Sequence, residues 1–399
     1  MYQFLCRVYQ KGMKLVLDIV PFWRRPELIK GRDSLKKIPG LLKQKNVGRV
    51  LLVTDVGLAK LGLHVQLLEW LSADGIACAV YDKTVANPTI DNVEEALLLY
   101  RKEDCQAIIA FGGGSPMDCA KTVGARVAKP NQPVSKMRGI LKIHKRIPLL
   151  IAIPTTAGTG SETTLAAVIK DAQTLEKYPI NDFVLIPQYA VLDPVLTVGL
   201  PGHITAQTGM DALTHAVEAY IGKSNTKQTR QDSIDAVKLI FENLEKAYAD
   251  GADLGARAKM QQAAFLAGAA FTRAYVGKVH AIAHSLGGEY GTPHGLANAV
   301  ILPYVLDEYG DTVYKSLAEL ADLVGLGKGT AEEKAKAFIA EIRAMNARMG
   351  IPAKLPGIRE EDIDKLARRA IREANPLYPV PKIMRHDELK KLYYQVKEA

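Results

Sequence analysis

Short apolar runs alternate with segments of helical spacing through the first half of the chain, and this order constrains the fold strongly. Three runs are rich in aliphatic residues: RVLLVTD (49–55), IACAVYD (76–82) and AIIAFGGG (107–114). The segments between them carry apolar residues three or four positions apart. Continuous apolar strands that alternate with helices are typical of a parallel sheet covered on both faces. We therefore expect an α/β domain in this half.

The pattern changes near residue 200. From Thr205 onward, long Ala- and Leu-rich segments follow one another without β-branched runs, which indicates helices alone. The breakers in VGLPGH (198–203) mark a boundary, and a chain of 399 residues is long for a single core. We predict an α/β plus all-α protein, with a parallel-sheet domain at 1–200 and an all-helical domain at 201–399.

Composition excludes several classes of protein. The 48% of hydrophobic and 24% of charged residues match a globular enzyme. The net charge of +9 comes without long Lys and Arg clusters, so we expect solvated basic helix faces or attraction of anionic cofactors, not a nucleic-acid interface. Four cysteines without a CxxC pair favour reduced thiols and a cytoplasmic location. Arg7, Lys11, Lys14 and Asp18 interrupt the apolar N-terminus, so we expect no signal peptide, membrane helix or membrane partner.

A glycine-rich loop, FGGGSPMDCAK (111–121), joins an expected strand to an expected helix. We expect Ser115 to cap this helix and Pro116 to be its first residue. Glycines let backbone N–H groups approach a phosphate, and the helix N-terminus attracts anions. The loop lacks the GxGxxG pattern, so it predicts either a nucleotide site or merely a tight turn.

A second polar loop, PTTAGTGSE (154–162), also follows a strand, and Asp55 ends the first strand. Loops at the carboxyl ends of parallel strands face the same crevice, so the two loops together favour a dinucleotide site. Asp55 could accept hydrogen bonds from an adenosine ribose, or it could cap the next helix. The loop threonines could also be ordinary turn residues: Thr155, Thr156 and Thr159.

Histidines and one aspartate are spaced as metal ligands in the second half. Asp211 and His215 in GMDALTHAVEAY (209–220) lie four positions apart, as do His280 and His284 in HAIAHSLGGEYGTPHG (280–295). His294 follows an expected turn at GGEYGTP. A single histidine in an apolar helix is usually a hydrogen-bonded core residue, but two such pairs and a fifth residue predict a site for Fe²⁺ or Zn²⁺.

With these motifs, the chain resembles the iron-containing (group III) alcohol dehydrogenase family from about residue 25 to the C-terminal region. The resemblance is carried by GGGSPMDCAK, PTTAGTGSE, LDP, TGMDALTHAVEAY and HAIAHSLGGEYGTPHG, in this order. It implies a Rossmann-like NAD-binding domain, a helical metal-binding domain and an active site in the cleft between them. It also implies metal-dependent hydride transfer between a small, primary alcohol and NAD, or the reverse reduction of an aldehyde.

Matching the motifs residue by residue implies roles for individual side chains. The metal ligands would be Asp211, His215, His280 and His294, with His284 as a catalytic histidine that is not a ligand. The cofactor contacts would be Asp55, Asn87, Gly113, Gly114, Ser115, Asp118, Thr155, Thr156, Thr159 and Lys177. Lys177 stands in a looser version of the family segment. Phe271 and Tyr275 would border the substrate; Tyr275 is bulkier than the small residue expected, and could narrow the pocket or pack between helices.

The resemblance also implies cofactors and partners. Fe²⁺ would be the native ion, with Zn²⁺ or Ni²⁺ as substitutes, and NAD would be preferred to NADP because Asp55 repels a 2′-phosphate. A homodimer or larger homo-oligomer acting on a small alcohol or aldehyde is expected. Alternatives are a zinc-dependent polyol dehydrogenase or dehydroquinate synthase of the same superfamily, a metallohydrolase using the Asp/His set, and a basic binding protein. The TGMDALTH and PHG contexts argue against the two superfamily relatives.

Overall fold

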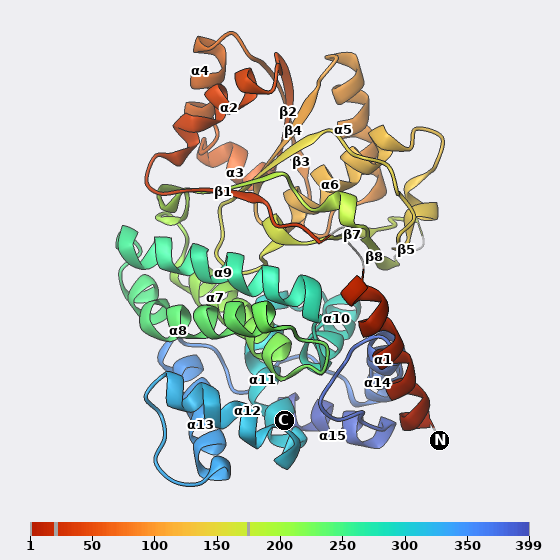
Figure 1. Cartoon of the computed structure of the whole chain (residues 1–399), viewed down its shortest axis with the longest axis vertical. Helices are drawn as coiled ribbons and strands as arrows, with labels where there is room; N and C mark the ends of the chain where they lie inside the picture. The colour runs from red at the N-terminus through yellow and green to blue at the C-terminus, as the bar shows by residue number, and fades with distance from the viewer. Residues whose placement is uncertain (1, 20–22, 174–175, 399) are drawn as a thin grey trace. The chain divides into compact units, whose positions relative to one another are not determined.

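The computed structural model describes residues 2–19, 23–173 and 176–398, and the chain divides into two compact units (Figure 1). The parallel-sheet unit spans Phe22–Gly199. The helical unit combines Leu200–Ala399 with Met1–Pro21. The predicted fold class, a parallel-sheet domain followed by a helical one, is confirmed.

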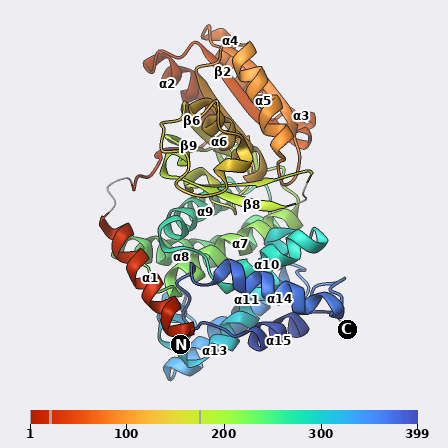
Figure 2. The ribbon, with the colours of Figure 1, turned by 90° about the vertical axis from the view of Figure 1, so that its right-hand side faces the viewer.

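Six strands form the parallel sheet in the order β1-β9-β6-β4-β2-β3 (Figures 1 and 2). Each neighbouring pair is parallel. The strands are β1 (Glu27–Lys30), β2 (Arg49–Asp55), β3 (Ala77–Thr84), β4 (Ala107–Gly112), β6 (Leu149–Pro154) and β9 (Tyr189–Leu192). Of the three apolar runs in the sequence, two are therefore the neighbouring inner strands β2 and β4, and the third is the edge strand β3.

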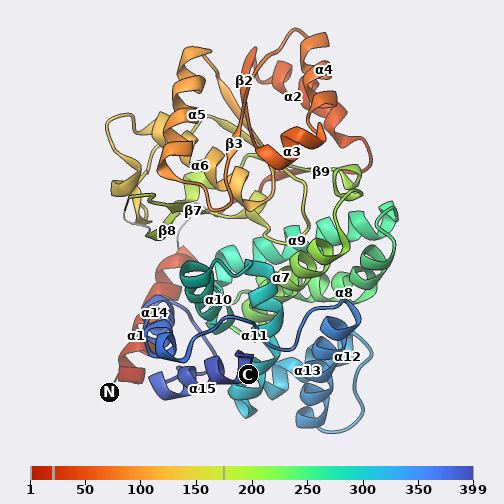
Figure 3. The same cartoon turned by 180° about the vertical axis from the view of Figure 1, so that it is seen from behind.

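Helices cover both faces of this sheet, with α5 and α6 on one face and α2 and α4 on the other (Figure 3). Leu51 and Ile108 point into one core, whereas their chain neighbours Leu52 and Ile109 point into the other. This alternation is the period of two that strands impose on side chains, and it explains why both faces need apolar residues. The helices are α2 (Ile38–Gln44), α3 (Val56–Leu61), α4 (Val65–Ala73), α5 (Ile90–Lys102) and α6 (Gly114–Ala128).

A second, three-stranded sheet in the same unit was not predicted. It consists of β5 (Gly139–Ile140), β7 (Ala166–Lys170) and β8 (Lys177–Asn181), in the order β5-β8-β7. β7 and β8 pair antiparallel, and β5 pairs parallel to β8. The strands are short and β8 contains Pro179, so no clear strand pattern marks them in the sequence.

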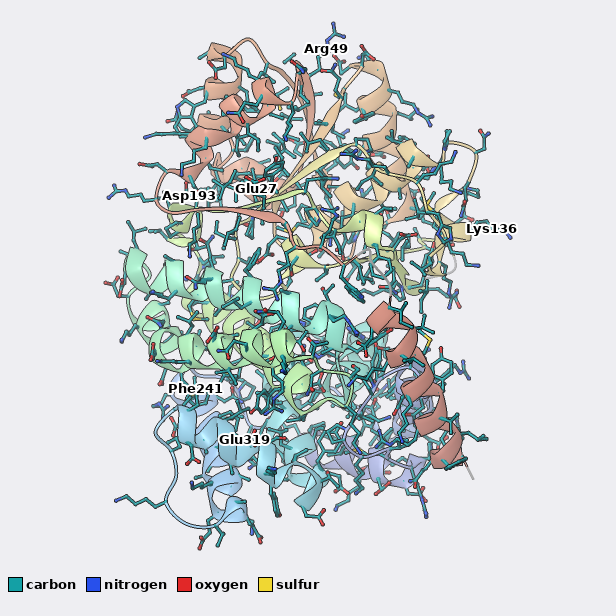
Figure 4. All side chains as sticks on the ribbon, in the orientation of Figure 1. Glu27, Arg49, Lys136, Asp193, Phe241 and Glu319 are labelled. Atoms are coloured by element: carbon teal, nitrogen blue, oxygen red, sulfur yellow. The ribbon has the colours of Figure 1, made fainter. Side chains whose placement is uncertain are left out.

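Ten helices among the described residues build the helical unit. They are α1 (Tyr2–Ile19), α7 (Gly202–Ile221), α8 (Lys227–Ala249), α9 (Leu254–Ala274), α10 (Lys278–Tyr290), α11 (His294–Tyr309), α12 (Asp311–Leu323), α13 (Ala331–Arg348), α14 (Glu360–Ala374) and α15 (His386–Val396). Aromatic side chains join some of them: Phe241 of α8, which Figure 4 labels, stacks on Phe338 of α13 with ring centroids 5.3 Å apart. Among the described helices, none combines the length and apolar character needed to cross a bilayer.

The first helix does not belong to the domain to which the sequence assigned it. The division after Gly199 lies at the expected breakers, but α1 groups with the helical unit. The reason is that α1 forms hydrogen bonds with residues more than 370 positions later in the sequence. The Arg7 guanidinium donates to the carbonyls of Val380 (2.6 Å) and Pro381 (2.7 Å). Contacts of this kind leave no periodic trace in a sequence.

The approach of α7 to α8 generates a prediction about stability. A Cβ built on Gly209 of α7 would lie 2.2 Å from Leu244 Cδ1 of α8, so we expect Gly209→Ala to lower the free energy of unfolding by about 1–3 kcal/mol. The matched variant is Gly288→Ala in α10, where a Cβ would meet no atom within 4 Å. It should raise the free energy of unfolding by about 0.5–1 kcal/mol, because alanine favours the helix. Urea unfolding of the full chain, followed by circular dichroism, measures both variants. Changes in the free energy of unfolding that have the same sign in both variants would contradict the packing argument.

Candidate metal centre and nucleotide loops

Three helices of the helical unit bring four side chains together. α7 carries Asp211 and His215 one turn apart, α10 carries His280, and His294 is the first residue of α11. One ligand atom of each lies within 4.8 Å of those of the other three. One carboxylate oxygen and three imidazole nitrogens suit a divalent transition metal, so the residue set expected from the sequence fits the ion chemically.

His280 is held in the form that a metal needs. Its Nδ1 donates to Glu218 Oε2 at 2.6 Å, which leaves the lone pair on Nε2, 3.9 Å from Asp211 Oδ1. Burial, together with the imidazoles of His215 and the other histidines nearby, lowers the pKa of His280 well below its usual value. The ring is therefore neutral at physiological pH, and its free nitrogen faces Asp211.

Glu218 joins α7 to the start of α10, and the sequence analysis did not single it out. Its carboxylate is buried and accepts the backbone N–H groups of Gly277 and Val279, each at 2.7 Å. A Cβ on Gly277 would lie 2.6 Å from Glu218 Oε1, so glycine is required for this approach. Burial raises the pKa of Glu218 to about 7. The signal was present, because Asp211, His215 and Glu218 follow i, i+4, i+7 spacing on one helical face.

Asn298 of α11 is a second residue that the sequence reasoning missed. Its Nδ2 lies 2.6 Å from Asp211 Oδ1, 3.2 Å from His280 Nε2 and 3.1 Å from His294 Nε2. Three acceptor atoms thus converge on an amide group that has two protons to offer. A divalent cation satisfies such a set of converging lone pairs more fully, which is independent support for a metal site.

His284 lies beside these four residues without joining them. It is one turn after His280 on α10, and its Nδ1 donates to Glu373 Oε1 of α14 at 2.6 Å. The hydroxyl of Tyr378 donates to the same oxygen at 2.8 Å. The His284 ring stacks on that of His294, with centroids 5.2 Å apart. The Glu373 carboxylate therefore orients the His284 ring, as Glu218 orients that of His280.

The turn between His284 and His294 begins later than the glycines suggested. α10 continues through Gly287 and Gly288 and ends at Tyr290, and the C-cap Gly291 has a left-handed φ of +68°. Glycine inside a helix costs only about 1 kcal/mol relative to alanine, so two glycines do not break a helix that packing supports. The left-handed residue followed by a proline does end it.

The two expected substrate residues lie at the end of α9. Phe271 stacks on His215 with ring centroids 4.2 Å apart, so it contacts one of the four candidate metal ligands directly. Tyr275 caps the helix, and its N–H donates to the Phe271 carbonyl at 2.7 Å. Its φ of +67° is rare for a bulky residue, and burial raises the pKa of its hydroxyl. The structure thus gives Tyr275 a strained backbone one turn from Phe271.

In the parallel-sheet unit, the glycine loop leads from β4 into α6. Gly112 has a φ of +145°, and α6 begins at Gly114 with Gly113 as its N-cap. The expectation that Ser115 caps this helix and that Pro116 is its first residue is therefore wrong, because they are its second and third residues. The Ser115 hydroxyl instead accepts the N–H of Asn87 at 3.2 Å, because Gly113, two residues earlier and extended in backbone, is already the N-cap.

The loop after β6 packs directly on the glycine loop, because β4 and β6 are neighbours in the sheet. A Cβ added to Gly113 would lie 3.6 Å from Thr156 Oγ1, and one added to Gly114 would lie 3.3 Å from Thr159 Cγ2. The Thr155 N–H donates to the carbonyl of the last residue of β4 at 3.2 Å. The two loops meet at the carboxyl edge of the sheet, where open α/β sheets bind ligands.

A buried lysine in α6 ties this second loop down. Lys121 Nζ donates to Ser161 Oγ (3.1 Å) and to Thr164 Oγ1 (2.7 Å), and burial lowers the pKa of the lysine to about 8. Asp118 accepts from Ser161 Oγ (3.2 Å) and from the Val168 N–H (3.0 Å), and burial raises its pKa. Asp118 thus holds the loop in place, and Lys121, which the sequence reasoning missed, does the same.

Of the remaining cofactor candidates, Asp55 ends β2 and Asn87 follows β3 at this edge of the sheet, whereas Lys177 begins β8 of the second sheet. Lys177 Nζ donates to Asn87 Oδ1 at 2.6 Å, and Asn87 has a φ of +59°. Asp55 ends β2 and caps α3, with its Oδ1 accepting the Leu58 N–H at 2.9 Å. The structure therefore shows the capping role of Asp55, which uses one of its two carboxylate oxygens. Its contact with a ribose stays a prediction.

Comparisons with known proteins agree with both halves of this description. The sequence profile of iron-containing alcohol dehydrogenase matches residues 26–194, and that of the Fe-containing alcohol dehydrogenase family, C-terminal, matches residues 205–396. The chain is 37% identical over 357 residues to an NAD-dependent methanol dehydrogenase from Bacillus methanolicus, covering 88% of this chain and 93% of the relative. It is 40% identical over 334 residues to a 1,3-propanediol dehydrogenase from Klebsiella pneumoniae, covering 82% and 86%.

The structural comparison indicates the same family as the sequence comparison. The structure of an alcohol dehydrogenase from Oenococcus oeni superposes with a TM-score of 0.90 at 35% identity, covering 93% of this chain and 98% of the other. Family profiles and relatives together span the strands, the glycine loops and the helices that carry the Asp/His cluster. The chain belongs to the iron-containing alcohol dehydrogenase family.

Proposed function

We propose that the chain is an NAD-dependent, iron-dependent alcohol dehydrogenase acting on small primary alcohols and aldehydes. The observation that carries this proposal is the convergence of four ligand atoms from Asp211, His215, His280 and His294 within 4.8 Å. When bound, the metal would polarise the substrate oxygen and the nicotinamide would carry the hydride. Relatives named as methanol and 1,3-propanediol dehydrogenases support a small alcohol as substrate.

The side chains of the helical unit would hold the ion and move the proton. Glu218 keeps the Nδ1 proton of His280 in place, so that Nε2 faces the ion. Glu373 does the same for His284, so that His284 Nε2 can accept the proton of the alcohol or return it. Phe271, stacked on His215, would exclude water from one side of the substrate.

The loops of the parallel-sheet unit would bind the dinucleotide. The backbone of Gly113 and Gly114, Ser115 and the N-terminus of α6 would hold the pyrophosphate, since this helix end has no side-chain cap. Thr155, Thr156 and Thr159 would border it from the second loop. Asp55, Asn87 and Lys177 would lie at the adenosine side, whereas Asp118 would act through the loop that it anchors.

Ion, compartment and assembly complete the proposal. The family name supports iron, and Zn²⁺ or Ni²⁺ would occupy the same donor set after aerobic handling. The four cysteines are free, which suits the reducing cytoplasm. We further propose that the enzyme is a homo-oligomer.

The ligand assignment is tested by metal content. His280→Ala and His294→Ala should each lower bound metal well below one ion per chain and lower activity, because each removes one of four ligands. His284→Ala should lower activity while bound metal is retained. Elemental analysis of protein loaded anaerobically with Fe²⁺ measures this, with Glu218→Gln as a variant expected to weaken metal affinity by about 10- to 100-fold. Full occupancy in His280→Ala, or metal loss only in His284→Ala, would overturn the assignment.

Cofactor choice is tested at Asp55. Its charge should repel a 2′-phosphate, so the unmodified protein should prefer NAD(H), and Asp55→Ser should raise the NADP/NAD ratio of kcat/KM by roughly tenfold. Serine keeps a cap for α3 while removing the charge, which separates cofactor choice from folding. The matched control is Asp104→Ser, which removes the same charge from a carboxylate that is 88% exposed just before β4. Equal kcat/KM with both cofactors in the unmodified protein would contradict the proposal.

Substrate size is tested at Tyr275. If this residue borders the pocket, Tyr275→Ala should raise kcat/KM for longer or branched aldehydes relative to acetaldehyde by roughly tenfold, the effect of one or two methylene groups. Tyr275→Phe keeps the ring and should leave the profile unchanged. A profile that is also unchanged in folded Tyr275→Ala would show that the ring only packs between helices.

A further inference from the structure

Helix α1 docks onto the helical unit with its polar side inward. The side chains that bond to the rest of the unit recur at three or four positions: Gln3, Arg7, Gln10, Lys14 and Asp18. Arg7 donates to the Val380 carbonyl at 2.6 Å, Gln10 donates to the Tyr378 carbonyl at 2.7 Å, and Asp18 pairs with Arg273. An amphipathic helix usually buries its apolar stripe, so this orientation is the reverse of the common one.

The outward side of α1 is apolar. Eight large side chains remain exposed by 43% to 73%: Tyr2, Phe4, Leu5, Val8, Tyr9, Leu15, Val16 and Ile19. At 3.6 residues per turn they occupy an arc of about 160° around the helix, and Gly12 lies at its middle. A Cβ built on Gly12 would meet no atom within 4 Å. Large apolar side chains therefore surround the centre of the arc, where Gly12 leaves the helix backbone uncovered.

The exposed apolar area of α1 is comparable to one side of a protein–protein interface. The exposed parts of the eight side chains amount to on the order of 800 Å², more than the largest patch of about 300–600 Å² on a typical monomer. One partner in a standard protein interface contributes about 800 Å². The surface of α1 is thus large enough, by itself, to be one half of a stable interface.

The charges on α1 argue against a lipid surface as the occupant. Helices that lie on a bilayer carry Lys and Arg on their polar face, where these residues meet anionic headgroups. In α1, Arg7 and Lys14 donate into their own chain, to the carbonyls of Val380 and Asn225. Lys11 is left at the edge of the arc. The apolar surface therefore offers little electrostatic attraction to a membrane.

The spacing of α1 favours a second helix. Leu5, Val8, Gly12, Leu15 and Ile19 follow one another at intervals of three and four, the seam of two packed helices. A central glycine lets two backbones approach closely where the helices cross. A twofold axis through such a point pairs each surface with its own copy, so one apolar arc is complementary to another.

We propose that α1 is an interface between two copies of this chain, in which two α1 helices cross at Gly12 about a twofold axis and bury their apolar arcs. The profile match to the family begins at residue 26, so this contact is an addition that lies outside the matched fold. It is independent of the dehydrogenase activity proposed above.

The first test measures assembly mass by sedimentation equilibrium of the full chain. Val8→Glu/Leu15→Glu places two carboxylates in the arc and should reduce the mass to half that of the unmodified assembly. The control Lys102→Glu places a carboxylate on an exposed side chain of the other unit and should leave the mass unchanged. Equal mass for the unmodified chain and the double variant would overturn the proposal.

A second test keeps the proposal falsifiable if the double variant fails to fold. Gly12→Cys should form a disulfide-linked dimer under mild oxidation, seen on a non-reducing gel, because the two helices meet at this position. Lys102→Cys, in a side chain that is 79% exposed in the other unit, should not. Failure of Gly12→Cys to cross-link overturns the proposal. So does binding of the unmodified chain to phosphatidylserine vesicles that the double variant loses without a change in mass.

Discussion

The buried carboxylate of Glu218 is the contact on which the helical unit's site depends. It accepts two backbone N–H groups from the start of α10 and the Nδ1 proton of His280, and so ties α7 to α10 at the level of the metal cluster. A buried carboxylate is costly unless it accepts hydrogen bonds, and here three donors supply them. Because Asp211 and His215 are on the same face of α7 as Glu218, this one contact brings residues more than 60 positions apart within ligand distance.

In the parallel-sheet unit, a buried lysine has the role that the buried carboxylate of Glu218 has in the helical unit. The ammonium group of Lys121 is buried and donates to several oxygens of the loop after β6, while Asp118 receives the Ser161 hydroxyl and the Val168 N–H. The loop is thereby fixed against the glycine loop at the edge of the sheet. In both units, a buried ionisable side chain holds the segment that lies at the binding site, namely the start of α10 with His280 in one unit and the loop after β6 in the other.

These anchors explain which parts of the site could be foreseen. Asp211, His215, His280 and His294 were predicted because the spacing of ligands on a helix is local and periodic, and the structure brings their ligand atoms together. Glu218 lay on the same periodic face, but a carboxylate in an Ala-rich helix resembles an ordinary surface residue until its partners are known. Asn298 lies four positions after His294 on α11, so its spacing was a signal, but its contacts with Asp211 and His280 depend on the packing of separate helices. Glu373 had no signal, because it meets His284 only through the packing of α14 against α10.

The sequence by itself determined the order of most elements. The strands β2, β3, β4 and β6 follow from continuous apolar runs, the helical second half and the ligand spacing follow from the period of 3.6, and the two loops follow from their glycines. Tertiary structure alone decided three further points. It made Gly113 and not Ser115 the cap of α6, continued α10 through Gly287 and Gly288, and docked α1 on the helical unit by its polar side. Each depends on hydrogen bonds or packing between segments far apart in the chain, whose free energy exceeds local preference and leaves no pattern among neighbouring residues.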